Sequence, residues 1–189
     1  MTGSVKTMWT ASVAIVMMLQ LHSVHVMTAT VPACGLPGNV VLEAQNLLRD
    51  LGPLFPVRCL PYNGNATFPR RAFTNGTRCR QALRALHESL QGAEQVFEDY
   101  DVAFGEGALA WDRHMLDDFQ NLQNRLLREG GCVPTTAASP DPGMSAYFGN
   151  VSALLQQQEN ATCGWSVLRR DMLWVLKTAL HRHHSCFSW

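Results

Sequence analysis

The chain has 189 residues, of which 15 are basic and 15 acidic, so its formal net charge at pH 7 is zero. Charged residues make up only 16% of the composition and the two signs balance, which excludes a polybasic nucleic-acid-binding chain and an acidic solvating tail. Apolar residues reach 47%, too many for a disordered chain, and the length suits one packed domain.

The first 33 residues have the pattern of a secretory signal peptide. Lys6 is their only charged residue, an apolar run follows from Ala11 to Leu21, and small residues at 31–33 suit a cleavage site. The alternative is a membrane anchor, which needs about 20 apolar residues, and this run is about half as long. No run of about 18 apolar residues occurs later in the chain, so we expect no membrane insertion. Residues 1–33 are therefore predicted to be a signal peptide and residues 34–189 the mature domain.

Five stretches of the mature chain place apolar residues at the helical period. The predicted helices span residues 39–51, 78–97, 109–129, 143–158 and 163–183. About 26 residues rich in Gly, Pro and Asn separate the first two helices, which is enough for the chain to cross a whole bundle. Only about four residues separate the last two helices, which makes these antiparallel neighbours. The pattern predicts an all-α fold, a five-helix bundle with a long first crossover loop.

All six cysteines lie in the predicted mature domain, and no two of them are close in sequence. They are Cys34, Cys59, Cys79, Cys132, Cys163 and Cys186. Zinc knuckles and redox centres need cysteines a few residues apart, so neither kind of site is expected. An even number of cysteines in a secreted chain indicates three disulfides, and the spacing leaves all of the roughly 15 possible pairings open.

Four N-glycosylation sequons also indicate a secreted chain. Their asparagines are Asn65, Asn75, Asn150 and Asn160, and none of the four sequons has proline at its middle position. We expect at least two of them to carry glycans.

No catalytic or metal-binding constellation is present in the sequence. It has no nucleophile elbow, no glycine-rich phosphate loop and no His-Glu-x-x-His motif. The histidines near residues 181–184 diverge around one helical turn, and their position at a helix C-terminus suits the helix dipole better than a metal. The acidic pair Asp117 and Asp118 is expected on a solvated face. We expect neither an enzyme nor a protein with a cofactor or a metal.

One motif carries family information. Residues 163–170, with the sequence CGWSVLRR, resemble the Cys-Ala-Trp-Glu-Val-Val-Arg signature that opens the last helix of type I interferons. Residues 34–37 (CGLP) resemble the mature start Cys-Asp-Leu-Pro of that family, and further matches follow in order along almost the whole mature chain. The extra cysteines Cys79 and Cys186 depart from the four-cysteine mammalian pattern. These departures make the chain similar to interferons of fish or other lower vertebrates.

The resemblance implies a helical-cytokine fold and a function in receptor binding rather than in catalysis. Members of this family are secreted antiviral cytokines that join two class II cytokine receptor chains, of the interferon alpha/beta receptor type, and activate Janus kinases. The implied partner is therefore a two-chain receptor, and no nucleic acid or cofactor is implied.

The resemblance also implies disulfide pairs and contact residues. It implies Cys34–Cys132 and Cys59–Cys163, which leaves Cys79–Cys186. Receptor contacts are implied at Leu60, directly after the loop cysteine, and at Arg169, six positions after the helix cysteine. Leu173 shares the outward side of the helix with Arg169, one step beyond the apolar stripe.

Two positions nearby differ from the family pattern, and the motif's tryptophan belongs to the core. Asn63 and Trp174 stand where basic contact residues are expected, so Arg169 is weighed against an ordinary solvated arginine. Trp165 falls on the apolar stripe with Leu168 and Met172, and we expect its role to be packing.

Two alternatives remain on sequence grounds. One is an interferon-lambda or interleukin-10-like cytokine, which the Cys-x-Trp motif disfavours. The other, from a different class, is a secreted six-cysteine helical carrier of apolar ligands, which lacks support because the required Cys-x-x-x-Cys step is absent.

Overall fold

The computed structural model describes residues 35–64, 66–74, 76–104, 109–130 and 141–189. Within these ranges it contains five long helices: α2 (Gly38–Asp50), α3 (Cys79–Asp99), α4 (Arg113–Glu129), α5 (Pro142–Leu155) and α6 (Ala161–Arg182). The short elements are strands β1 (Leu36–Pro37) and β2 (Phe187–Ser188) and the 3₁₀ turns η1 (Val57–Asn63), η2 (Arg70–Phe73), η4 (Gln158–Asn160) and η5 (His184–Cys186). The predicted all-α bundle is confirmed, and each predicted helix corresponds to an observed one.

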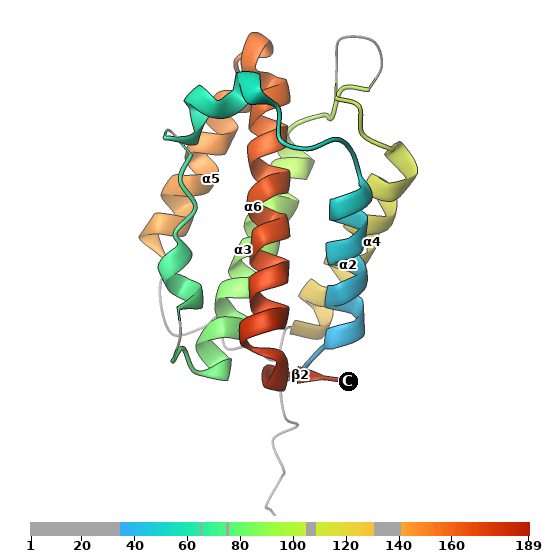
Figure 1. The fold of residues 1–189 in the computed structure, drawn as a ribbon, viewed down its shortest axis with the longest axis vertical. Coiled ribbons are helices and arrows are strands. Elements are labelled where there is room, and N and C mark those ends of the chain that lie inside the picture. The colour runs from blue at the N-terminus through green and yellow to red at the C-terminus, as the bar shows by residue number, and fades with distance from the viewer. Residues whose placement is uncertain (1–34, 65, 75, 105–108, 131–140) are drawn as a thin grey trace, which may run out of the picture. The chain divides into compact units, whose positions relative to one another are not determined.

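Helix α6 is the central element of the bundle (Figure 1). It packs against α2, α3 and α5, and both η1 and η2 lie against it. Its buried side is wide, since it includes residues on more than one stripe, from Cys163 through Leu168 and Met172 to Leu180. Helix α4 completes the bundle by packing on α2 and α3.

The segment between α2 and α3 is the predicted crossover loop. In Figure 1 it leaves the upper end of α2, passes the N-terminal end of α6 and descends on the other side to the start of α3. Helices α2 and α3 therefore run in the same direction, although they follow each other in sequence. A short loop cannot make this connection, which explains the length of the segment.

Two helices begin where an aspartate caps their first turn. The side chain of Asp112 accepts a hydrogen bond from the backbone N–H of Met115, and Asp141 accepts from Gly143 and Met144. Such caps satisfy amide groups that have no partner inside the helix. The prediction that the third helix starts at residue 109 was early by four residues, because Asp112 fixes the start of α4 at Arg113.

Trp165 lies in an aromatic cluster within the core. Its side chain is 3% exposed, stacks on Phe97 with ring centroids 5.2 Å apart, and meets Trp111 edge-on at 6.2 Å. Phe119 adds an edge contact to Phe97 from α4. The cluster joins α3, α4 and α6, so the tryptophan of the family motif is a packing residue, as its stripe position predicts.

The two ends of the described domain meet. Strand β1 pairs with β2 in parallel, with Leu36 opposite Phe187, and a disulfide joins Cys79 to Cys186. The Trp189 ring lies against Gly38, where a Cβ atom would come within 2.7 Å of it. Only glycine fits at this position without moving the tryptophan.

We expect Trp165→Ala to lower the free energy of unfolding by ~3–5 kcal/mol, because it leaves a cavity between three helices. Denaturant unfolding followed by circular dichroism measures this loss. Trp189→Ala is the matched control, since Trp189 is 61% exposed, and it should cost much less. Equal losses for the two variants would contradict the packing role of Trp165.

Candidate functional site

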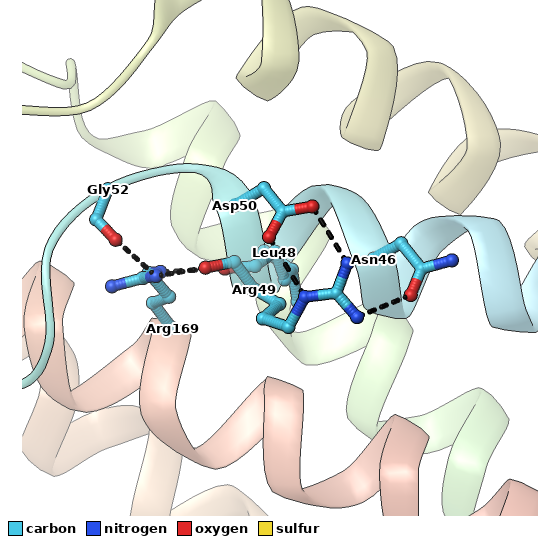
Figure 2. A network of polar contacts seen from close by, with 6 residues as sticks. All are labelled: Asn46, Leu48, Arg49, Asp50, Gly52 and Arg169. Carbon is cyan, nitrogen blue, oxygen red and sulfur yellow. Dashed lines mark hydrogen bonds and ion pairs between the residues drawn. The ribbon is translucent and has the colours of Figure 1, made fainter.

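The C-terminal end of α2 is bound by a side chain from α6 (Figure 2). Arg169 donates from Nε to the carbonyl of Leu48 at 2.7 Å, and from Nη2 to the carbonyls of Arg49 at 2.8 Å and Gly52 at 2.7 Å. Its Nη1 donates to the carbonyl of Pro53. The last carbonyls of a helix have no hydrogen-bond partner within the helix and carry partial negative charge. A cationic donor such as a guanidinium therefore supplies both the missing hydrogen bonds and a favourable charge interaction. We call this set of four hydrogen bonds the Arg169 clamp.

The clamp differs from what the helix period predicts for Arg169. The period turns this residue away from the stripe of its own helix, which favours a guanidinium free to bind a partner. In the structure the end of α2 occupies that side, and most donors of the guanidinium are already used. Burial lowers the pKa of Arg169, and the carboxylate of Asp50 partly offsets this effect.

A disulfide and a tyrosine fix the rest of the same loop. Cys59 in η1 is bonded to Cys163 in the first turn of α6, the pairing that the resemblance implies. Three residues further on, the Tyr62 hydroxyl donates to the side chain of Asn160, just before α6. Residues 48–62 are thus attached at three points to α6 or to the residue before it.

The loop that these contacts hold presents apolar side chains to solvent. Leu54 is 92% exposed, Val57 is 80% exposed and Leu60 is 51% exposed. These three residues, which we call the apolar ridge, are most of the strongly exposed large apolar residues in the described part of the chain. Only Leu60 was named from the sequence. Leu54 and Val57 were missed because they lie outside any helical stripe, although apolar residues within a Pro-rich loop were a usable signal.

A hollow of about 350 Å³ lies beside the ridge. Leu54 and Phe55 form one side of it, Trp111 another, and Leu173 lines it from α6. The guanidinium of Arg170 lies 5.0 Å from the centre of the Phe55 ring. Leu173 is therefore part of the same surface as the ridge, partly buried at its base.

Trp174 has a different role from the basic residue that the family pattern places there. Its ring packs against Phe68 at 5.8 Å and Phe73 at 5.9 Å, and the Arg70 guanidinium lies 4.9 Å from its centre. Trp174 thus fastens the descending half of the crossover loop to α6.

The remaining named residues are divided between described and undescribed parts of the chain. Asn150 is exposed on α5, and Asn160 is half-buried and donates its amide to Gln157 at 2.7 Å. Cys34, Asn65, Asn75 and Cys132 lie outside the described residues, as does the predicted signal peptide at residues 1–33.

Two further observations concern the described residues as a whole. None of their helices combines the length and apolar character that a membrane span needs. No group of three His, Cys, Asp or Glu side chains within them is placed to hold a metal ion.

We expect Arg169→Ala to lower the free energy of unfolding by ~2–3 kcal/mol, because four backbone carbonyls lose a charged donor. Arg169→Lys should restore only part of the loss, since an ammonium group lacks the planar fork that reaches separate carbonyls. Thermal or denaturant unfolding measures both variants. The control is Arg49→Ala, whose solvent-exposed ion pair with Asp50 should contribute little to stability. An Arg169→Ala protein as stable as this control would show that the clamp is not formed.

Comparison with known proteins identifies the family. Residues 38–181 match the family model described as "Interferon alpha/beta domain". Interferon alpha-1 of Bos taurus is 28% identical over 74% of this chain and 79% of its own length. Interferon omega-1 of Homo sapiens is 26% identical over 83% of this chain and 87% of its own.

A solved structure agrees with these relatives. Zebrafish interferon 2 superimposes with a TM-score of 0.61 at 26% identity, over 77% of this chain and 98% of that one. Together with the family model, this structural match favours the type I interferon family over the two alternatives that the sequence left open. With its five-helix bundle and crossover loop, this chain belongs to the type I interferon family, whose members are non-enzymatic cytokines.

Proposed function

We propose that the protein is a secreted antiviral cytokine that joins two class II cytokine receptor chains of the interferon alpha/beta receptor type and thereby activates Janus kinase signalling. Membership of the type I interferon family supports this proposal. The maturation that goes with it is removal of residues 1–33, glycosylation at some of the four sequons and a third disulfide between Cys34 and Cys132.

The observation that carries the proposal is the apolar ridge. Large apolar side chains exposed in water are unfavourable unless a partner covers them, and Leu54 and Val57 are almost fully exposed. A loop that is already ordered loses little conformational entropy on binding, and this loop is fixed by the Arg169 clamp and the Cys59–Cys163 disulfide. We therefore assign the ridge to a protein partner rather than to a small ligand.

We assign the proposed receptor residues different tasks. Leu60 contacts the receptor directly together with Leu54 and Val57, and Leu173 contributes the base of the adjoining hollow. Arg169 acts as a positioning residue, because its guanidinium holds the carbonyls of the loop. The exposed side chain of Arg58 lines the same hollow, whereas Arg49 beside it is already paired with Asp50, so the receptor surface should place an acidic residue opposite Arg58 beside an apolar centre.

Binding to the receptor ectodomains by surface plasmon resonance tests the ridge. Leu54→Ala, Val57→Ala and Leu60→Ala should retain the wild-type circular dichroism, and at least one should weaken Kd tenfold or more, about 1.4 kcal/mol. Leu42→Ala is the matched control, because Leu42 is 42% exposed on α2 away from the loop, and its Kd should stay within about twofold. Losses below ~1 kcal/mol for all three ridge variants would place the binding hot spot elsewhere.

The same variants distinguish binding from signalling. Applied to cells of the same species, the wild-type protein should induce antiviral genes, and an antibody that blocks the receptor should abolish the response. Ridge variants should need higher concentrations in proportion to their loss of affinity. Induction that persists with the receptor blocked would contradict the proposed partner.

A further inference from the structure

The charges of this neutral chain are unevenly distributed along the sequence. Between Leu51 and His87 there are six arginines and no acidic residue. After Asp171 the chain again has no acidic residue up to its last residue, Trp189. The balanced composition therefore hides two acid-free segments.

The fold brings these two segments together. The Cys79–Cys186 disulfide joins the start of α3 to the residues after α6, with the two Cα atoms 5.2 Å apart. Arg182 donates to the carbonyl of Phe73 in η2 at 3.2 Å, and Arg70 lies over the Trp174 ring of α6. Turn η2 also packs against α3.

Five cations are exposed along this junction, and we call them the basic surface. They are Arg70, Arg71, Arg78, Lys177 and Arg182. Lys177 follows Trp174 by one helical turn, on the solvent side of α6, and Arg78 directly precedes Cys79. No ion pair involves any of the five among the residues that the structure describes.

Neighbouring carboxylates are engaged elsewhere. Glu88 pairs with Arg84 at 2.7 Å, and Asp171 is buried, bonded to Arg170 and accepting from Tyr147. Asp141 shares a hollow of about 410 Å³ with Arg71, but its side chain caps α5 through the amide of Gly143. The basic surface thus keeps most of its positive charge.

We propose that the basic surface binds a sulfated polysaccharide. Five like charges close together repel one another, and a ligand that carries several anionic groups along an extended chain relieves this repulsion. The guanidinium fork matches the oxygens of sulfate in a bidentate arrangement, and four of the five residues are arginines. The proposal draws on the proposed function only in requiring secretion, which exposes the protein to such polysaccharides.

A lipid surface fits the observations less well. The apolar ridge, which would insert into a bilayer, lies near the N-terminal end of α6, whereas the basic surface lies near its C-terminal end. From Arg169 to Arg182 the helix rises by about 20 Å. The ridge is therefore separate from Arg182, whereas Lys177 lies one helical turn beyond Leu173, which lines the adjoining hollow.

The test uses heparin as the probe and a charge-matched pair of variants. Arg71→Ala, Arg78→Ala and Lys177→Ala are combined in one protein, leaving out Arg70 and Arg182 because these make packing contacts. The control combines Arg49→Ala, Arg125→Ala and Arg128→Ala, which are exposed on α2 and α4, and so removes the same charge elsewhere; Arg113 is left out because its guanidinium lies over the Phe104 ring. Both proteins are enzymatically deglycosylated, because the sequon at Asn75 lies in the same segment.

We expect wild-type protein to bind immobilised heparin at physiological salt, with an affinity that falls as the salt concentration rises. The basic-surface variant should bind at least tenfold more weakly and the control variant within twofold of wild type, with circular dichroism unchanged in both. Equal losses in the two variants, equal binding to desulfated heparin, or stronger binding to phosphatidylserine vesicles than to heparin would overturn the proposal. Loss of receptor binding by the ridge variants, with heparin binding intact, would leave it standing.

Discussion

The attachment of the crossover loop to α6 is the constraint on which the rest of the structure depends. A loop that runs the height of the bundle has few local contacts of its own, and the ordering of each of its residues costs conformational entropy. The Cys59–Cys163 disulfide spans 104 positions of sequence, and such a cross-link stabilises a fold by about 4–5 kcal/mol in the chain-entropy account. The Arg169 clamp completes the attachment, because one side chain binds both a carbonyl in the last turn of α2, that of Leu48, and a carbonyl at the start of the loop, that of Gly52.

Helix α6 relates the two proposed binding surfaces. Its N-terminal end carries Cys163 and Arg169, which hold the apolar ridge, and its C-terminal end adjoins the basic surface. One end is suited to a protein partner by exposed apolar area on an ordered loop. The other is suited to a polyanion by unpaired charge. A cytokine with both surfaces can be retained on extracellular polysaccharide without blocking its receptor-binding loop.

Much of the fold was predictable from the sequence, because helical periodicity and loop length are local signals. The position of Trp165 in the core and the long connection before α3 follow from them directly. The Arg169 clamp was not predictable, since the period of α6 gives the direction of a side chain and not the element that lies there. The packing of Trp174 against Phe68 and Phe73 also depends on contacts between distant segments. Overall composition likewise concealed the basic surface, which forms only when η2 and α6 meet.

Hydrogen–deuterium exchange of the free and the receptor-bound protein tests the central claim most directly, since it reports on backbone order along the loop. The account predicts that residues 50–62 are already slow to exchange in the free protein, and that receptor binding slows exchange further within 53–62 and the N-terminal half of α6. Rapid exchange throughout 50–62 in the free protein, or receptor-induced protection confined to α3 and α4, would contradict it.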